Sequence, residues 1–334
     1  FEKILPGMID LVLNSEFICT KPIPLLRRLK SASVSMSQHQ ASCLLANAFF
    51  CTFPSSNGHY FPEINFFGYF IYRRLSQSSK LHCIVNYFSR VVRQEAGDGV
   101  LTFTRQVLDD PPSIDFWKNS TSPLRDMLVS SEGLIEKDGE GMLQVDFANK
   151  YLGGGVLRTG CVQEEIRFIT CPEAIVSCLL TECLLPNECL IIKGIETYSS
   201  FTGYAQSFRF HEDFVDCTPR DSWRRREKEL VAIDALPFRK PADQFDENLI
   251  LRELNKSYCG FMCTASNYLA PVATGKWGCG AFRGNPELKA LIQLMSASEC
   301  GRDMFFLTFG DANLAESLHH VHQLLVAHNK TVGE

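Results

Sequence analysis

The chain has 334 residues, of which 45% are hydrophobic and 21% charged, a composition typical of a globular protein with one large domain or two smaller ones. Its formal net charge of −5 argues against a general nucleic-acid binder, because such proteins present a basic face. The sequence contains neither a signal peptide nor an apolar run of about 18 residues, so no membrane association is predicted.

The 14 cysteines are scattered along the chain, and several lie in apolar runs, such as Cys43, Cys178, Cys183 and Cys189. This distribution is typical of reduced, buried thiols and predicts a protein of the nucleus or cytoplasm. The paired CxxC or Cys/His spacing of zinc sites is not found, so no metal is predicted. Because the chain starts at Phe1 rather than at Met, any targeting region is expected to lie outside it.

Residues 1–98 read as a mainly helical accessory region. Ser37 and Gln40 have capping-box spacing ahead of the apolar run 41–50. A second helix is expected at 81–93, where apolar residues recur on one face. We interpret this region as a helical layer that accompanies a second domain at 99–334.

From residue 101 onward, strand and helix patterns alternate. Such alternation predicts an α/β sandwich with helices on both faces of a central sheet, in which ligands gather beyond the strand ends. Caps at Thr170, Asn285 and Asp311 predict the starts of three helices, the first covering 174–184. The expected strands are 101–104, 141–147, 189–193, 229–233 and 304–309.

The stretch 143–165, LQVDFANKYLGGGVLRTGCVQEE, is the most informative part of the sequence. The backbone N–H groups of three consecutive glycines can form an anion-binding concavity suited to phosphate. Two carboxylates that follow so closely would repel a phosphate unless they hold hydroxyls or move a proton. The alternative is a mobile surface loop with a solvated acidic pair. The residues concerned are Asp146, Asn149, Gly153, Gly154, Gly155, Gln163, Glu164 and Glu165.

The same stretch, with VDFAN ahead of GGG-x7-QEE, closely resembles the motif of the poly(ADP-ribose) glycohydrolases of animals. The resemblance covers nearly the whole chain. It implies a macrodomain, a three-layer α/β/α sandwich with a mixed central sheet, plus the N-terminal helical accessory region. Further blocks in the family's order are ANAFFCTFP at 46–54, LTFTRQ at 101–106, FTGYAQSF at 201–208, VAIDAL at 231–236, ATGKWGCGAFRG at 273–284 and LTFGD at 307–311.

The resemblance implies hydrolysis of the ribose–ribose O-glycosidic bonds of poly(ADP-ribose), mainly from the free end, without a metal or cofactor. It makes Glu165 the general acid/base, which protonates the departing ribose 2′-oxygen and then takes a proton from the water attacking an oxocarbenium-like C1. Glu164 and Asn149 would bind the terminal ribose and Gln163 would shape the loop. Asp146 would support the site or, alternatively, only close an Asx-type turn. Because Glu164 and Glu165 are adjacent, we expect their side chains to diverge and to divide the work rather than flank the bond.

A second glycine-rich loop lies between the expected strand at 231–236 and the cap at Asn285. N–H groups ahead of a helix suit a diphosphate, and the resemblance gives this loop that role. A tight strand-to-helix turn is the alternative. Lys276 stands where family members usually carry Asn, so its contribution is open. The residues predicted to bind are Gly278, Cys279, Gly280, Ala281 and Phe282.

Aromatic side chains complete the predicted pocket. The resemblance places Tyr204 over the substrate and Phe309 near the adenine, where stacking contributes about 1–3 kcal/mol. For Phe309, a plain strand-core position is the alternative. Ile135 and Glu136 resemble the pair that reads the adenine edge, with Glu136 accepting from the exocyclic amine. The basic run 223–226 is interpreted as a solvated helix face rather than a phosphate patch.

The expected partners are poly(ADP-ribose), poly(ADP-ribosyl)ated proteins and ADP-ribose as product, with no direct nucleic-acid binding, no membrane and a monomeric chain. Two other functions remain open. One is a catalytically silent ADP-ribose reader, against which the intact Glu165 argues. The other is a nucleotide-binding scaffold, which would bind ADP or ATP as well as ADP-ribose.

Overall fold

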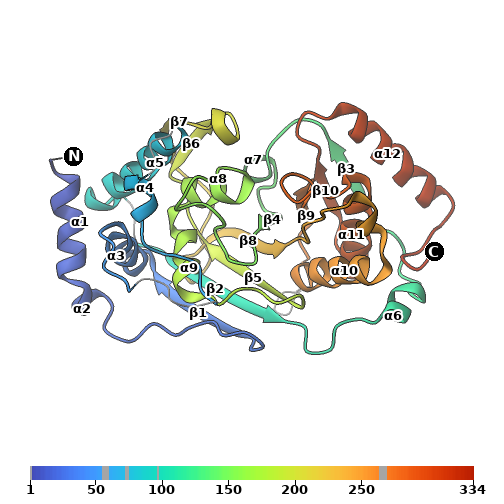
Figure 1. The fold of residues 1–334 in the computed structure, drawn as a ribbon, viewed down its shortest axis with the longest axis horizontal. Helices are drawn as coiled ribbons and strands as arrows, with labels where there is room; N and C mark the ends of the chain where they lie inside the picture. Colours follow the sequence, from blue (N-terminus) through green and yellow to red (C-terminus); the bar gives the residue numbers. More distant parts are fainter. Residues whose placement is uncertain (1, 55–59, 72–74, 96–97, 263–268) are drawn as a thin grey trace. The chain divides into compact units, whose positions relative to one another are not determined.

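The computed structural model describes residues 2–54, 60–71, 75–95, 98–262 and 269–334. The chain divides into two compact units, here named unit 1 and unit 2 (Figure 1). Unit 1 comprises Phe1–Arg105, Ala148–Cys183 and Ile192–Glu227, and unit 2 comprises Gln106–Phe147, Leu184–Ile191 and Lys228–Glu334. The side chains of Cys43, Cys178, Cys183 and Cys189 are buried, as predicted.

Unit 1 contains most of the N-terminal helices. Its elements are α1 (Ile4–Leu13), α2 (Ser15–Ile18), β1 (Ala32–Ser37), α3 (Gln38–Phe49), α4 (Phe67–Ile71), α5 (Leu75–Val92), β2 (Val100–Val107), α8 (Gln163–Thr170), the 3-10 helix η1 (Pro172–Val176), α9 (Ser177–Leu180), β6 (Ser199–Thr202), the 3-10 helix η2 (Ala205–Ser207) and β7 (Arg209–Asp213).

Unit 2 contains parallel strands and the longer C-terminal helices. Its elements, including the strands that start or end in unit 1, are α6 (Ile114–Lys118), β3 (Met127–Ser130), α7 (Ile135–Asp138), β4 (Leu143–Ala148), β5 (Glu188–Gly194), β8 (Arg226–Asp234), the 3-10 helix η3 (Pro241–Phe245), α10 (Glu247–Phe261), β9 (Val272–Gly275), α11 (Pro286–Glu299), β10 (Met304–Leu307) and α12 (Ala312–Ala327). Within the described ranges, none of the helices is both long and apolar enough to cross a membrane.

The larger sheet is mixed, as predicted. Its eight strands are hydrogen-bonded in the order β1-β2-β5-β8-β4-β9-β10-β3. β1 runs antiparallel to β2, whereas β4 runs parallel to β9, β9 to β10 and β10 to β3. Parallel strands end at the same edge, so the loops that follow β9 and β10 start there.

The sheet of unit 2 has packed side chains on both faces. Met304 and Phe306 of β10 pack with residues of α11 and α12, among them Leu294. Leu307 points to the opposite face and packs with Ile135 of α7. Helices therefore cover both faces, as the α/β/α prediction requires, and Figure 1 shows α10 and α11 side by side within this layer.

Four predicted helix starts can be compared with the structure. Ser37 forms the expected capping box, in which its hydroxyl accepts the Gln40 N–H at 3.0 Å and the Gln40 side chain accepts the Ser37 N–H at 3.1 Å. Asn285 caps α11 and Asp311 caps α12, each through a side-chain oxygen. The helix expected after Thr170 is wrong, because Thr170 ends α8 and only η1 and α9 follow.

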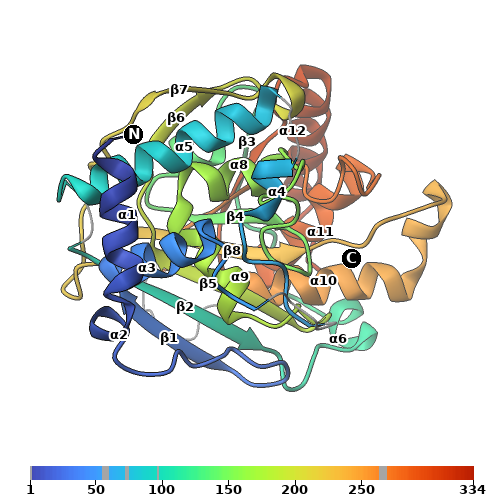
Figure 2. The same ribbon diagram turned by 60° about the vertical axis from the view of Figure 1, so that its left-hand side comes forward.

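The N-terminal region is not purely helical, because β1 occupies residues 32–37. Its Val34 and Met36 are buried, while the intervening serines face outward. The hydroxyls of Ser33 and Ser35 each bond a threonine hydroxyl of β2 at 2.9 Å. The helices expected at 41–50 and 81–93 correspond to α3 and α5, and Figure 2 shows α1 lying beside both.

The run 223–226 does not form a helix face, so that interpretation is wrong. Asp221 accepts the backbone N–H groups of Trp223 and Arg225, both at 2.9 Å, and thereby closes a turn. Its other oxygen accepts the Arg225 side chain at 2.8 Å. Arg226 already belongs to β8.

A buried carboxylate fixes the segment that follows α8. Glu173 in η1 accepts the side-chain amide of Gln38 at 2.8 Å, the hydroxyl of Tyr198 at 2.7 Å and the backbone N–H of Glu196 at 2.9 Å. Since Gln38 starts α3, these bonds join α3 and the 196–198 segment to the end of α8.

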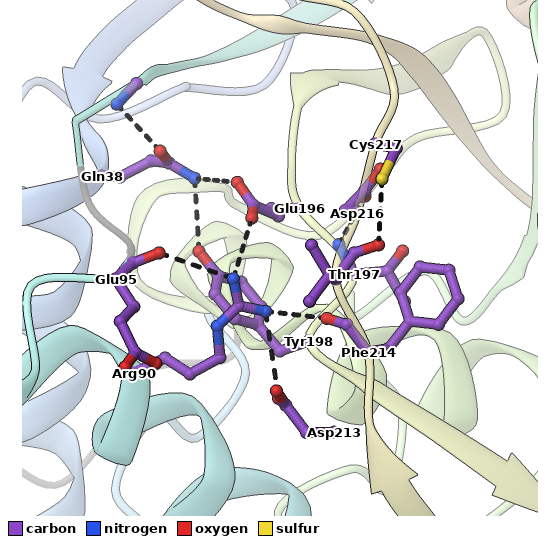
Figure 3. A network of polar contacts seen from close by, with 12 residues as sticks. Gln38, Arg90, Glu95, Glu196, Thr197, Tyr198, Asp213, Phe214, Asp216 and Cys217 are labelled. Carbon is purple, nitrogen blue, oxygen red and sulfur yellow. Dashed lines mark hydrogen bonds and ion pairs between the residues drawn. The ribbon is translucent and has the colours of Figure 1, made fainter.

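Three arginines surround Glu196 in this network, and Figure 3 shows one of them, Arg90, beside it. Its carboxylate lies 2.9 Å from Arg220, 3.1 Å from Arg226 and 3.7 Å from Arg90 of α5. Arg90 also donates to the carbonyl of Phe214 at 2.7 Å. The arginines balance the buried charge of Glu196, and Arg90 ties α5 to the same group.

We expect Glu173 to make stability depend on pH. Burial, the largest cause, raises the pKa of Glu173 to about 7 from 4.5, while the bonds from Tyr198, Glu196 and Gln38 oppose it. Because the folded pKa exceeds the unfolded one, this group's contribution is complete below about pH 4.5 and is lost as pH rises through 7, a change of about 3 kcal/mol. Urea unfolding of wild type and Glu173→Gln between pH 4.5 and 8 measures it. Parallel stability curves for the two proteins would contradict this expectation.

Candidate active site

Two adjacent carboxylates stand in the first turn of α8. The helix begins after Val162, and Glu164 and Glu165 are its second and third residues. Carboxylates at this end interact favourably with the unpaired N–H groups and the helix dipole. Both are buried, with exposed fractions of 2% for Glu164 and 7% for Glu165. A buried charge needs hydrogen-bond donors, and the glycine loop supplies them.

Glu164 is bound by the first half of this loop. Its two oxygens accept the N–H groups of Asn149 at 2.9 Å and Gly153 at 2.7 Å. The side-chain oxygen of Asn149 accepts the Tyr151 N–H at 3.0 Å, which fixes the turn between them. Asn149 and Glu164, both predicted to bind ribose, are therefore in direct contact.

Glu165 is bound on both sides by backbone. One oxygen accepts the Gly155 N–H at 2.9 Å, and the other accepts the Val162 N–H at 2.8 Å. The second bond is half of a capping box, because Val162 has no side-chain acceptor to return it. Glu165 therefore has a single orientation set by the loop before α8.

The two carboxylates converge over Gly154 instead of diverging. A Cβ placed on Gly154 would lie 2.6 Å from an oxygen of Glu165 and 2.8 Å from an oxygen of Glu164. Gly154 also has φ of +49°, in the left-handed region that favours glycine. The expectation of diverging side chains is wrong because the loop bonds draw one oxygen of each residue to the same point.

The loop N–H groups face protein oxygens. Those of Gly153 and Gly155 donate to the acidic pair, and that of Gly154 donates to the Tyr151 carbonyl at 3.1 Å. The donors that we expected to face a phosphate instead hold the carboxylates. The glycines thus orient the acidic pair and keep side chains away from it.

Tyr204 follows β6 and lies beside the start of α8. Its side chain is half-exposed, at 54%. Partial burial raises the pKa of its hydroxyl, a backbone hydrogen bond from Gln163 opposes that shift, and the charge of Glu165 adds to it. Unit 1 therefore brings together Tyr204, Gln163, the acidic pair and the glycine loop.

The other predicted residues lie in unit 2, several of them at the carboxyl ends of its parallel strands. Asp146 is completely buried in β4. Phe309 comes two residues after β10, is 36% exposed and has φ of +50°, so the strand-core alternative is wrong. Its ring lies 6.4 Å from that of Phe147, in a T-shaped contact.

The second glycine-rich loop follows β9 and leads into the cap of α11. Trp277 is fully buried at its base and donates its ring N–H to the Ile233 carbonyl at 2.9 Å. Backbone turn bonds shape the loop, among them Gly284 N–H to the Gly278 carbonyl at 2.9 Å. Lys276 is half-buried in the first turn, and Gly280 and Ala281 are exposed. Cys279 and Phe282 are half-buried, and burial raises the pKa of the Cys279 thiol to about 12.

Ile135 and Glu136 start the short helix α7. Ile135 is 2% exposed and packs against Ala273 of β9 and Leu307 of β10. Glu136 is half-buried in the same turn. The Ile135 side chain thus fixes α7 on the strands whose ends carry the second loop and Phe309.

Several residues that shape the site escaped the sequence analysis. Gly160 lies against Glu165, since a Cβ on it would be 2.6 Å from the carboxylate. Tyr69, Gln77 and Lys80 contact backbone carbonyls of residues 155–158. A sequence pattern cannot identify these contacts, because every residue type has a backbone carbonyl that could accept the bond.

Comparisons with known proteins identify the family of the chain. The family model "Poly (ADP-ribose) glycohydrolase (PARG), helical domain" matches residues 1–105, and "Poly (ADP-ribose) glycohydrolase (PARG), Macro domain fold" matches residues 114–316. The domain division predicted after residue 98 stays a prediction.

Relatives and solved structures are similar over long stretches. The chain is 34% identical to poly(ADP-ribose) glycohydrolase 1 of Arabidopsis thaliana, covering 100% of this chain and 76% of the relative. It is 33% identical to the probable poly(ADP-ribose) glycohydrolase 2 of the same plant, covering 93% and 69%. The crystal structure of poly(ADP-ribose) glycohydrolase from Thermomonospora curvata matches with a TM-score of 0.40 and 15% identity, covering 60% of this chain and 78% of that one.

The two family models leave few residues of the chain unmatched, and the two plant relatives align over nearly all of it. The chain therefore belongs to the poly(ADP-ribose) glycohydrolase family and is a glycosidase with a macrodomain and an N-terminal helical region.

Proposed function

We propose that this chain hydrolyses the ribose–ribose O-glycosidic bonds of poly(ADP-ribose), mainly from the free end, and releases ADP-ribose. The observation that supports this most is the buried acidic pair whose oxygens converge over Gly154. A side chain at position 154 would cover the oxygens that must meet a sugar, and glycine leaves them open.

In the proposed reaction, Glu165 is the general acid and then the general base. It protonates the 2′-oxygen of the departing ribose and afterwards takes a proton from the water that attacks the oxocarbenium-like C1. Such proton transfer contributes about 10²–10⁴-fold to the rate. The bonds from Gly155 and Val162 hold the carboxyl group at one orientation, so little reorganisation accompanies each transfer.

The neighbouring residues of unit 1 bind the sugar. Glu164 and Asn149 take the hydroxyls of the terminal ribose, and Tyr204 lies over it. Gln163 shapes the first turn of α8. The chain is expected to act as a monomer on poly(ADP-ribosyl)ated proteins of the nucleus or cytoplasm. The supporting role of Asp146, the diphosphate-binding role of 278–282 and the adenine contacts of Ile135, Glu136 and Phe309 stay predictions from the family resemblance.

The test is a time course with protein-attached poly(ADP-ribose). Hydrolysis from the free end predicts that ADP-ribose is the first soluble product, with no earlier oligomers. Oligomers ahead of monomer would contradict the exo mode, and ADP-ribose binding without any release would make the chain a reader.

A change at Asn149 separates this function from a nucleotide-binding scaffold. We expect Asn149→Ala to weaken ADP-ribose binding about 10-fold, the cost of one lost polar contact of about 1.4 kcal/mol, and to leave ADP binding unchanged. Calorimetric titration with both ligands measures this. Equal effects on ADP and ADP-ribose would instead support the scaffold.

A further inference from the structure

A buried lysine of the helical region faces the carbonyl side of the glycine loop. Lys80 in α5 has an exposed fraction of 0%. Its ammonium donates to the carbonyls of Gly155 at 3.4 Å, Val156 at 2.9 Å and Arg158 at 3.1 Å. An ammonium has three N–H donors, so each of them has one carbonyl.

Two further side chains bind the same turn. The hydroxyl of Tyr69 in α4 donates to the Val156 carbonyl at 2.8 Å, and the amide of Gln77 in α5 donates to the Arg158 carbonyl at 2.6 Å. The N–H groups of the loop hold the acidic pair, while its carbonyls are held from α4 and α5. α5 lies beside α8 (Figure 2).

Gly155 connects the two sides directly. Its carbonyl accepts from Lys80, and its N–H donates to Glu165 at 2.9 Å. Only the backbone of one residue separates the ammonium from the carboxylate. A loop that moved away from Lys80 would therefore change the orientation of Glu165.

Burying the Lys80 ammonium has a desolvation cost that a role in packing alone does not explain. A buried ammonium loses its hydration, and Lys80 has no ion pair among the described residues, so three carbonyls replace water. Burial, the largest cause, lowers the pKa of Lys80 to about 8 from 10.5, while the negative charge of Glu165 opposes this. An apolar side chain would avoid the cost, so the lysine indicates a role in the site.

We propose that Lys80 is a positioning residue: its ammonium holds residues 155–158 in the conformation in which Gly155 and Val162 orient Glu165 for proton transfer. This inference rests on the proposed function of Glu165. Lys80 touches neither the sugar nor the reacting atoms and acts through the loop backbone.

Protonation of Lys80 should then control the rate. The neutral amine has only two N–H donors, and its lone pair would face the third carbonyl. Of the groups that face the ammonium, Cys161 has its pKa raised to about 11, Cys83 to about 12 and Tyr69 well above its usual value, so these stay neutral near pH 8. The remaining neighbour is Glu165. We expect kcat to fall as pH rises through about 8, because the ammonium is present below this pH and lost above it.

The experiment compares wild type with Lys80→Met and with Ser78→Ala, a control at an exposed position of the same helix. We expect Lys80→Met to lose about 10²-fold in kcat, the effect of a carboxylate displaced by about 1 Å, to keep the Kd for ADP-ribose within about threefold, and to lose the fall in kcat near pH 8. Hydrogen exchange followed by mass spectrometry should show at least about 10-fold faster exchange in peptides covering 153–162 only. Ser78→Ala should match wild type throughout.

The possible outcomes distinguish a failure of the positioning role of Lys80 from a failure of the proposed function. Unchanged kcat and unchanged loop exchange in Lys80→Met would overturn the positioning role. So would faster exchange throughout the chain, which would show general destabilisation. Tyr69→Phe, which removes one loop bond without a change of charge, should lose only a few-fold in kcat and keep the pH dependence. If wild type released no ADP-ribose, the proposed function would fail, and the exchange data would still decide whether Lys80 holds the loop.

Discussion

Glu165→Gln is expected to reduce the rate of ADP-ribose release by at least about 10²-fold, since an amide neither gives nor takes the proton that the reaction requires. The substitution keeps the size of the side chain and removes its acid–base chemistry, while its NH₂ group replaces one oxygen that accepts a backbone N–H. ADP-ribose binding should remain, because Glu165 is not predicted to hold the product. Release of ADP-ribose and calorimetric titration of the same protein samples measure both quantities.

Glu164→Gln is the matched control for this experiment. Both glutamates accept two backbone N–H bonds, so either amide must turn its NH₂ group towards one N–H donor. The structural disturbance is therefore shared, whereas the proton transfer is lost only at position 165. We expect the Glu164 variant to show a weaker effect, of about 10-fold, mainly in KM. Equal losses of kcat in the two variants would mean that loop geometry, not acid–base chemistry, explains the result.

Gly154→Ala has the second largest expected effect, a loss of about 10²-fold in kcat/KM. The new methyl group would lie 2.6 Å from an oxygen of Glu165 and 2.8 Å from one of Glu164, so both carboxylates must move. The left-handed backbone at this position adds strain of its own, since φ is +49°. Steady-state kinetics together with urea unfolding separate the two contributions.

Gly141→Ala provides the matched comparison. Gly141 also has a left-handed backbone, with φ of +74°, but a Cβ there would meet nothing within 4 Å. We expect it to lose about 1 kcal/mol of folding stability and to retain its activity within about twofold. If Gly154→Ala were no worse than Gly141→Ala, the carboxylates would not depend on the open space above Gly154.

Local chemistry explains why much of the fold could be predicted. The caps at Ser37, Asn285 and Asp311 each join a side chain to an N–H three residues away, so the signal lies within one turn of sequence. The acidic pair and the glycine loop likewise lie close together in the sequence, so their association could be predicted. The family resemblance then supplied the macrodomain, which the family models confirm.

The parts that were missed depend on partners distant in sequence. Half of the residues of β1 are serines, which do not favour strands, and its pairing with β2, some 70 residues later, makes it a strand. At 223–226, the hydrogen bonds that Asp221 accepts form a turn, which the pattern of charged residues did not predict. The convergence of the Glu164 and Glu165 carboxylates over Gly154 likewise depends on hydrogen bonds from backbone N–H groups, which the residue types do not predict.

The bonds from Tyr69, Gln77 and Lys80 also bear on how such a protein can evolve. Residues 1–105 and 114–316 match separate family models, which suggests two modules that could be gained or lost independently. Yet the polar side chains that hold residues 155–158 come from the first module. Removing it would leave those carbonyls without their protein donors. Selection on the glycosidase must therefore act on both segments together, and a macrodomain that arose without the helical segment would need another way to hold its catalytic loop.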